Sequence, residues 1–148
     1  MKKIVLASDH AGYSLKESLK EFLKSQWSDI ELMDAGTHTA ESCDYPIFAG
    51  KAAKAVGEGV ADMGLVICGS GNGVSMVANK CPGVRCCLAW NREVARLGRA
   101  HNNANMLALP ARFITVEEAK EIVFAFMEEE FEGGRHLRRV EMVDKGCL

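Results

Sequence analysis

The residues best suited to chemistry gather around Cys68. The apolar run 65–67 leads into this cysteine, and three glycines (Gly69, Gly71 and Gly73) follow within five residues. Such a run is typical of a strand buried on both faces, and the glycines indicate a turn into a helix. Backbone N–H groups in that turn can hold a phosphate or an oxyanion, and the positive end of the helix favours a thiolate. The stretch therefore predicts a reactive thiol beside an anion-binding loop.

The glycine spacing matches neither common nucleotide-binding fingerprint. A dinucleotide loop needs Gly-x-Gly-x-x-Gly after the first strand, but position 74 is valine and the loop follows the third expected strand. A P-loop needs Gly-Lys-Ser or Gly-Lys-Thr at its end, and this loop has neither. A cysteine hydrolase stays open, because Cys68 and His101 supply the two side chains that such an enzyme pairs.

Further polar residues fall next to other expected strands. Asp9 and His10 follow the first strand, Arg112 follows the fifth, and His101 with Asn102 precedes the fifth. Ligands bind at the carboxyl ends of strands in open α/β sheets, so we expect these residues to join the thiol. Two of them also have a purely structural interpretation, since aspartate caps helices and a histidine at a helix end offsets the helix dipole.

A basic segment lies near the end of the chain. Arg135 and Arg139 stand four residues apart and so share one helix face, which suits them to hold a phosphate. Together with Arg138 they would otherwise form a solvated face. His136 is equally compatible with phosphate binding and with solvent exposure, and His38 is expected on the surface.

Strand and helix patterns alternate along the chain. Strands are expected at 3–8, 30–34, 65–67, 84–89 and 105–109, and helices at 15–24, 45–57, 73–78, 92–100, 116–127 and 135–145. This alternation predicts one α/β domain over residues 1–148, with three α/β/α layers, a Rossmann-like five-stranded parallel sheet and the first three strands in the order 2-1-3. A double glycine precedes the last helix, so residues 133–148 are expected to form a helical arm that packs on a partner subunit.

Composition excludes several classes of protein. The 148 residues carry a net charge of −2 and are 48% hydrophobic, enough for one packed domain without the basic excess of a nucleic-acid-binding protein. No apolar run approaches the length of a membrane span, and the first residues resemble a strand rather than a signal peptide, so we expect a cytoplasmic protein. The six cysteines form no Cys-x-x-Cys pair, and most are expected to be small buried apolar residues rather than disulfides or metal ligands.

Several motifs in sequence order resemble the ribose-5-phosphate isomerase B group, which also contains galactose-6-phosphate and allose-6-phosphate isomerases. The resemblance runs nearly end to end. It rests on Ala-Ser-Asp-His-Ala-Gly at 7–12, Asp-Tyr-Pro at 44–46, Ile-Cys-Gly-Ser-Gly-Asn-Gly at 67–73, Ala-Asn-Lys at 78–80, His-Asn-Asn-Ala-Asn at 101–105, and Glu-Gly-Gly-Arg-His at 132–136 with Arg139.

The resemblance implies interconversion of ribose 5-phosphate and ribulose 5-phosphate through a cis-enediolate, in the pentose phosphate pathway and without metal or organic cofactor. It implies that Cys68 moves the proton between C1 and C2 and that His101, with Asp9, opens the sugar ring. The residues implied to hold the oxyanion are Gly69, Ser70, Gly71, Asn72, Gly73 and Asn102, and Ser70 is counted as catalytic. Those implied to bind the phosphate are His10, Arg112, Arg135 and Arg139, while Tyr45 would line the sugar site. Family members are dimers or tetramers whose sites use both subunits, which implies a homodimer or homotetramer.

Two positions separate this chain from some members of the group. Relatives that lack the cysteine use a glutamate at the position of Val74, whereas valine cannot act as a base, which leaves Cys68 for that role. Ser70 stands where cysteine-type relatives often carry threonine, and both side chains offer a hydroxyl. Alternatives that stay open are an isomerase of allose or galactose 6-phosphate, an isomerase of free aldoses and ketoses, and a non-catalytic sugar-phosphate sensor.

Overall fold

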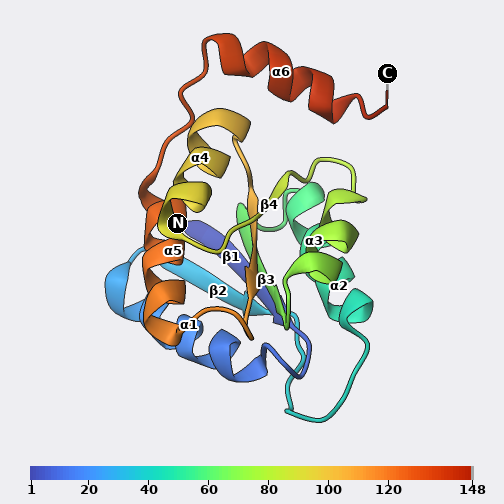
Figure 1. Cartoon of the computed structure of the whole chain (residues 1–148), viewed down its shortest axis with the longest axis vertical. Helices are drawn as coiled ribbons and strands as arrows, with labels where there is room; N and C mark the ends of the chain where they lie inside the picture. Colours follow the sequence, from blue (N-terminus) through green and yellow to red (C-terminus); the bar gives the residue numbers. More distant parts are fainter. Residues whose placement is uncertain (148) are drawn as a thin grey trace.

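A five-stranded parallel sheet lies between two layers of helices in the computed structural model, which describes residues 1–147 (Figure 1). The strands are β1 (Lys2–Ser8), β2 (Ile30–Asp34), β3 (Met63–Cys68), β4 (Cys86–Leu88) and β5 (Met106–Pro110). The helices are α1 (Tyr13–Gln26), α2 (Tyr45–Gly57), α3 (Asn72–Asn79), α4 (Arg92–Asn102), α5 (Val116–Glu128) and α6 (Arg135–Asp144). The strand order β2-β1-β3-β5-β4, with every pair parallel, confirms the predicted α/β class and the 2-1-3 arrangement.

The sheet separates two apolar cores because successive side chains of a strand point to opposite faces. In β1, Ile4 and Leu6 pack with helices α1, α4 and α5, while Val5 and Ala7 pack with α2 and α3. Figure 1 shows the same division, with α2 and α3 on one side of the sheet. Both faces of the central strands are therefore covered, as their continuous apolar sequences predict.

Most element boundaries differ from those expected by one or two residues, among them the boundaries of β4 and α4. β4 is shorter than the predicted strand 84–89, because side chains take its first hydrogen bonds: the N–H of Arg85 donates to Asn105 Oδ1 (2.8 Å) and that of Cys86 to Asn79 Oδ1 (2.8 Å). α4 continues beyond residue 100, so that His101 lies in its last turn rather than in a loop.

The C-terminal arm is a helix, as predicted, and follows two glycines with positive φ, Gly133 and Gly134. α6 lies against the end of α4, where Val140 is buried and Asp144 pairs with Arg85 (2.7 Å). Other apolar side chains of this helix, Leu137, Met142 and Val143, are exposed. The expected packing of the arm on a partner subunit stays a prediction, and residue 148 of the predicted arm lies outside the described residues.

All six cysteines are free. Only Cys68 is fully buried, whereas four are half-buried and Cys147 is exposed, so the expectation that most would be buried was wrong. Burial raises the pKa of the Cys87 thiol to about 12 and raises that of Cys86 further, so both thiols stay neutral. None of the helices within residues 1–147 combines the length and the apolarity that a membrane crossing requires.

A buried lysine, which the sequence analysis did not identify, ties α1 to the loop after β2. Lys16 is fully buried, and its Nζ donates to Asp34 Oδ1 (2.5 Å) and to the carbonyl oxygen of Thr37 (2.6 Å). Lys20 Nζ donates to Asp34 Oδ2 (2.7 Å). Burial by itself would raise the pKa of Asp34, but hydrogen bonds from both lysines and from the N–H of Gly36 lower it from 3.8 to about 2.

Asp34→Asn is expected to reduce the free energy of unfolding by about 2–4 kcal/mol at pH 7, because it leaves the buried ammonium group of Lys16 without its counter-charge. Since the folded-state pKa of Asp34 lies below its ordinary value, the pair stabilises the fold above pH 3.8 and loses this contribution as the pH falls toward 2. Urea unfolding of the wild type and of Asp34→Asn at several pH values should show that their difference in free energy of unfolding decreases as the pH falls from 3.8 toward 2. Glu21→Gln, which changes an exposed acid on the same helix, should have almost no effect.

Candidate active site

Three loops meet at the carboxyl ends of β1, β3 and β5. The N–H of Asp9 donates to the carbonyl oxygen of Ile67 (3.1 Å), which ties the loop after β1 to the end of β3. The N–H groups of Ala111 and Arg112 donate to the carbonyl oxygens of Cys68 (2.9 Å) and Gly69 (3.0 Å). The backbone therefore brings the aspartate, the thiol and the arginine predicted from sequence to one edge of the sheet.

Cys68 is the last residue of β3, and its side chain is 6% exposed. The N–H of Gly71 donates to its Sγ (3.2 Å), and α3 begins at the next residue, so an N–H donor and the amino end of a helix lie beside the sulfur. Gly71 has a φ of +77°, and a Cβ at this position would overlap the side chain of Leu88. Only glycine fits this turn, which explains the glycine at the point where the thiol receives its hydrogen bond.

Tyr45 and Arg112 border the glycine loop on two sides. Tyr45 is the first residue of α2, and a Cβ on Gly73 would overlap its ring. The guanidinium of Arg112 lies against the loop, with Nη1 3.0 Å from where a Cβ of Gly69 would be. Both side chains are exposed, as are Ser70 and Asn72, so this edge presents an open polar surface to which a ligand has access.

Asp9 and His10 follow β1 directly. The Oδ1 of Asp9 accepts a hydrogen bond from the N–H of Gly12 (3.0 Å), so the aspartate also stabilises the turn into α1. His10 Nδ1 accepts a hydrogen bond from the N–H of Cys43 (3.3 Å), which places the proton of a neutral ring on Nε2. Nε2 is therefore the atom with which this histidine can donate to an anion.

The other predicted residues lie at the opposite end of the sheet. α4 runs antiparallel to the strands, so its last turn carries His101 and Asn102 to the amino ends of β4 and β5, where Arg85 Nε donates to the carbonyl oxygen of Asn102 (3.0 Å). Figure 1 shows the end of α4 and the whole of α6 beyond this end of the sheet. Arg135 and Arg139 begin α6 in the same region. Within one chain His101 and Asn102 do not lie with Cys68, so the cysteine–histidine pair of a single-chain hydrolase is not formed, and a site that joins them across two subunits stays a prediction.

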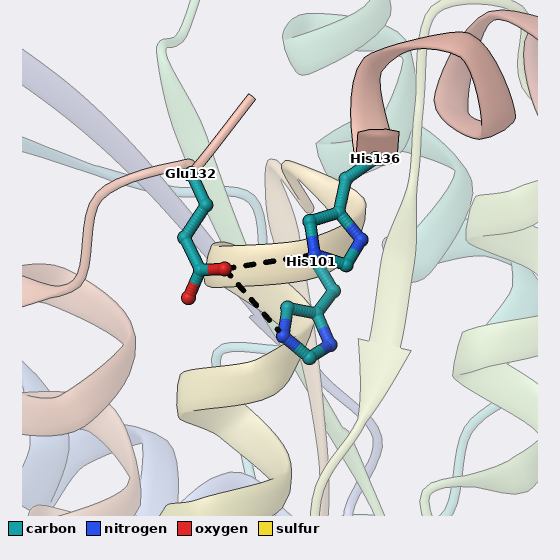
Figure 2. A group of neighbouring side chains, drawn as sticks. All are labelled: His101, Glu132 and His136. Carbon is teal, nitrogen blue, oxygen red and sulfur yellow. Dashed lines mark ion pairs between the residues drawn. The ribbon is translucent and has the colours of Figure 1, made fainter. Parts of the chain in front are cut away.

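His101 has two close polar neighbours (Figure 2). Its ring stacks on that of His136, with centroids 4.1 Å apart and planes inclined by 12°. Glu132 Oε1 lies 3.8 Å from His101 Nε2 and 3.5 Å from His136 Nε2. Removal from water lowers the pKa of His136, and the neighbouring His101 and Arg135 lower it further.

Glu132 was not among the site residues predicted from sequence, although it begins the motif at 132–136. The available signal was its position four residues before His136, but that spacing indicates a shared face only within a helix, and α6 begins after Glu132. A backbone hydrogen bond from its N–H to the carbonyl oxygen of Ala100 (2.9 Å) brings it beside His101. Such a long-range contact has no local sequence pattern.

Comparison with known proteins gives a family. The family model described as ribose/galactose isomerase matches residues 4–143. Ribose-5-phosphate isomerase B of Escherichia coli is 41% identical over 143 residues, which cover 97% of this chain and 95% of that protein.

Solved structures of related proteins share the whole fold. A ribose-5-phosphate isomerase B from Clostridium thermocellum is 46% identical, with a TM-score of 0.93 over 97% of this chain and 95% of the other. The enzyme from Mycoplasma genitalium, solved with bound ribulose-5-phosphate, is 41% identical, with a TM-score of 0.92 over 97% and 94% of the two chains. This chain therefore belongs to the ribose/galactose isomerase family and is an aldose–ketose isomerase.

Proposed function

We propose that the protein interconverts ribose 5-phosphate and ribulose 5-phosphate, with Cys68 as the base. The observation that carries this proposal is the buried thiol, which ends β3, receives the Gly71 N–H and faces the glycine loop. The protein also has relatives along nearly its whole chain that are ribose-5-phosphate isomerases B, and one of them was solved with bound ribulose-5-phosphate.

In the proposed reaction, the thiolate of Cys68 removes a proton from C2 of the open-chain aldose, and an enediolate forms. The hydroxyl proton on O2 passes to O1, and the same sulfur returns the carbon-bound proton to C1, so that C2 becomes the carbonyl carbon of the ketose. Carbon acids beside a carbonyl are weak, so most of the catalysis must come from stabilising the enediolate oxygens. The N–H groups of residues 69–73 that donate to neither Cys68 Sγ nor Ser70 Oγ would donate to these oxygens, together with the hydroxyl of Ser70.

The open ring must form before this step, and we assign ring opening to His101 with the help of Asp9. A histidine is suited to move a proton from one sugar oxygen to another near neutral pH. Within one chain these two residues lie at opposite ends of the sheet, so the proposal requires a second subunit. One subunit would contribute the thiol edge, and the other would contribute its His101 and the amide of Asn102.

The phosphate would be held by residues from the same two half-sites. His10 offers its Nε2 proton, and Arg112 offers a guanidinium beside the glycine loop. Arg135 and Arg139 of the second subunit would complete the set, with Tyr45 against the sugar. Because the phosphate does not react, its binding energy serves to position C1 and C2. The exposed apolar side chains of α6 suit a homodimer, alone or within a tetramer.

We place this reaction in the cytoplasmic pentose phosphate pathway, and the proposed steps use only side chains and N–H groups of the protein. Purified protein in a metal chelator should therefore convert ribose 5-phosphate faster than allose 6-phosphate, measured as kcat/KM for both substrates side by side. Preference for the hexose phosphate would keep the mechanism and refute the pentose assignment. Absence of turnover with either would refute the proposed function and favour a sensor.

A further inference from the structure

The side chains of His101, Glu132 and His136 bring three metal-binding atoms close together (Figure 2). The two Nε2 atoms and Glu132 Oε1 all lie within 4.8 Å of one another, and the oxygen is 3.8 Å and 3.5 Å from the two nitrogens. All three side chains are at least partly exposed, so an ion has access to them from solvent.

We propose that these three side chains bind one divalent cation of the zinc class. Two imidazole nitrogens and one carboxylate oxygen are a ligand set that zinc favours, and the fourth position would be left to water. With metal–ligand distances of about 2.0–2.2 Å, neighbouring ligands of a tetrahedral zinc ion stand about 3.3–3.6 Å apart. The two distances to Glu132 Oε1 are already close to this spacing.

The backbone brings the three ligands together from separate segments. The histidines belong to the last turn of α4 and the first turn of α6, and the N–H of Glu132 donates to the carbonyl oxygen of Ala100 (2.9 Å). Because the two rings are nearly parallel, binding requires one ring to tilt so that both nitrogens point at the ion. Gly133 and Gly134, both with positive φ, join Glu132 to α6, which begins next to His136.

This cation would be an inhibitor, a consequence that rests on the proposed function. His101 is the group to which we assign ring opening, and a nitrogen that binds a metal ion cannot exchange a proton with the sugar. Zinc bound here would therefore slow the reaction with the ring-closed substrate, so metal availability would set the activity of the enzyme.

Zinc binding is tested directly by competition with a chromophoric zinc chelator, using the full-length protein after removal of metal. We expect one zinc ion per chain, and at least about a tenfold weaker affinity in Glu132→Gln and in His136→Asn. Glu130→Gln and His38→Asn, which change exposed residues of the same types outside the group, should bind zinc as the wild type does. Equal affinity in all four variants would refute the site.

Binding to the Cys68 thiol is separated from binding at this site by Cys68→Ser. This variant should bind zinc with the affinity of the wild type. Loss of zinc binding in the variant would assign the ion to Cys68 and overturn the proposal. Turnover of ribose 5-phosphate is then followed with added zinc, each variant being compared with its own metal-free rate. Zinc should inhibit the wild type but affect Glu132→Gln at least about tenfold less. Specific zinc binding in a protein without isomerase activity would refute the proposed function and leave the site standing.

Discussion

Replacement of Cys68 by alanine is expected to lower kcat for ribose 5-phosphate by about a thousandfold or more. The reason is that no other described side chain at the glycine loop is a base in the position of the sulfur, since the residue at 74 is valine and is itself buried. Alanine fills most of the volume of cysteine, so the fold and the phosphate half-site should persist. Binding of ribose 5-phosphate, followed as a rise in the unfolding temperature, should therefore remain close to that of the wild type.

Cys81→Ala provides the matched control, because Cys81 is half-buried and follows α3 at its far end from the glycine loop. This variant should retain the turnover of the wild type. Near-normal turnover in Cys68→Ala would exclude the cysteine as the base. A covalent acyl intermediate trapped on Cys68 would instead support a cysteine hydrolase.

The architecture could be predicted from sequence because its signals are local. Apolar runs marked the strands, and spacing of three and four residues marked the helices that cover them. Parallel strands joined by helices then left few possible arrangements, so the 2-1-3 order of the first strands followed from general rules of chain connection. The glycine loop was equally visible, since its turn at Gly71 demands a residue without a side chain.

Contacts between distant segments could not be predicted in this way. Lys16 lies between Leu15 and Leu19 on the buried side of α1, a position that sequence reasoning reserves for apolar residues unless a counter-charge is known. Its partner Asp34 is 18 residues away, at the end of β2. The placement of His101 failed for a different reason. His101 directly precedes β5, and the crossover helix α4 returns the chain to the amino ends of the parallel strands, whereas Cys68 lies at the carboxyl end of β3.

Because His101 lies at the opposite end of the sheet from Cys68, mixing two inactive variants is expected to restore activity. Cys68→Ala and His101→Asn should each be nearly inactive alone, because each loses one half of every shared site. When the two are mixed in equal amounts and allowed to exchange subunits, half of the dimers contain one chain of each kind. Each mixed dimer then holds one intact site and one doubly defective site, so activity should return to roughly a quarter of the wild-type value.

The matched control is a mixture of Cys68→Ala with Cys68→Ser, whose changes fall in the same half-site, and it should recover nothing. Different affinity tags on the two chains allow mixed dimers to be isolated, so that subunit exchange is demonstrated independently of activity. Isolated mixed dimers of Cys68→Ala and His101→Asn without activity would show that no site is shared in this manner. Recovery would instead show that the thiol of one chain is completed by His101 of another, which would explain why α4 and α6 hold His101 and the two arginines at the opposite end of the sheet from Cys68.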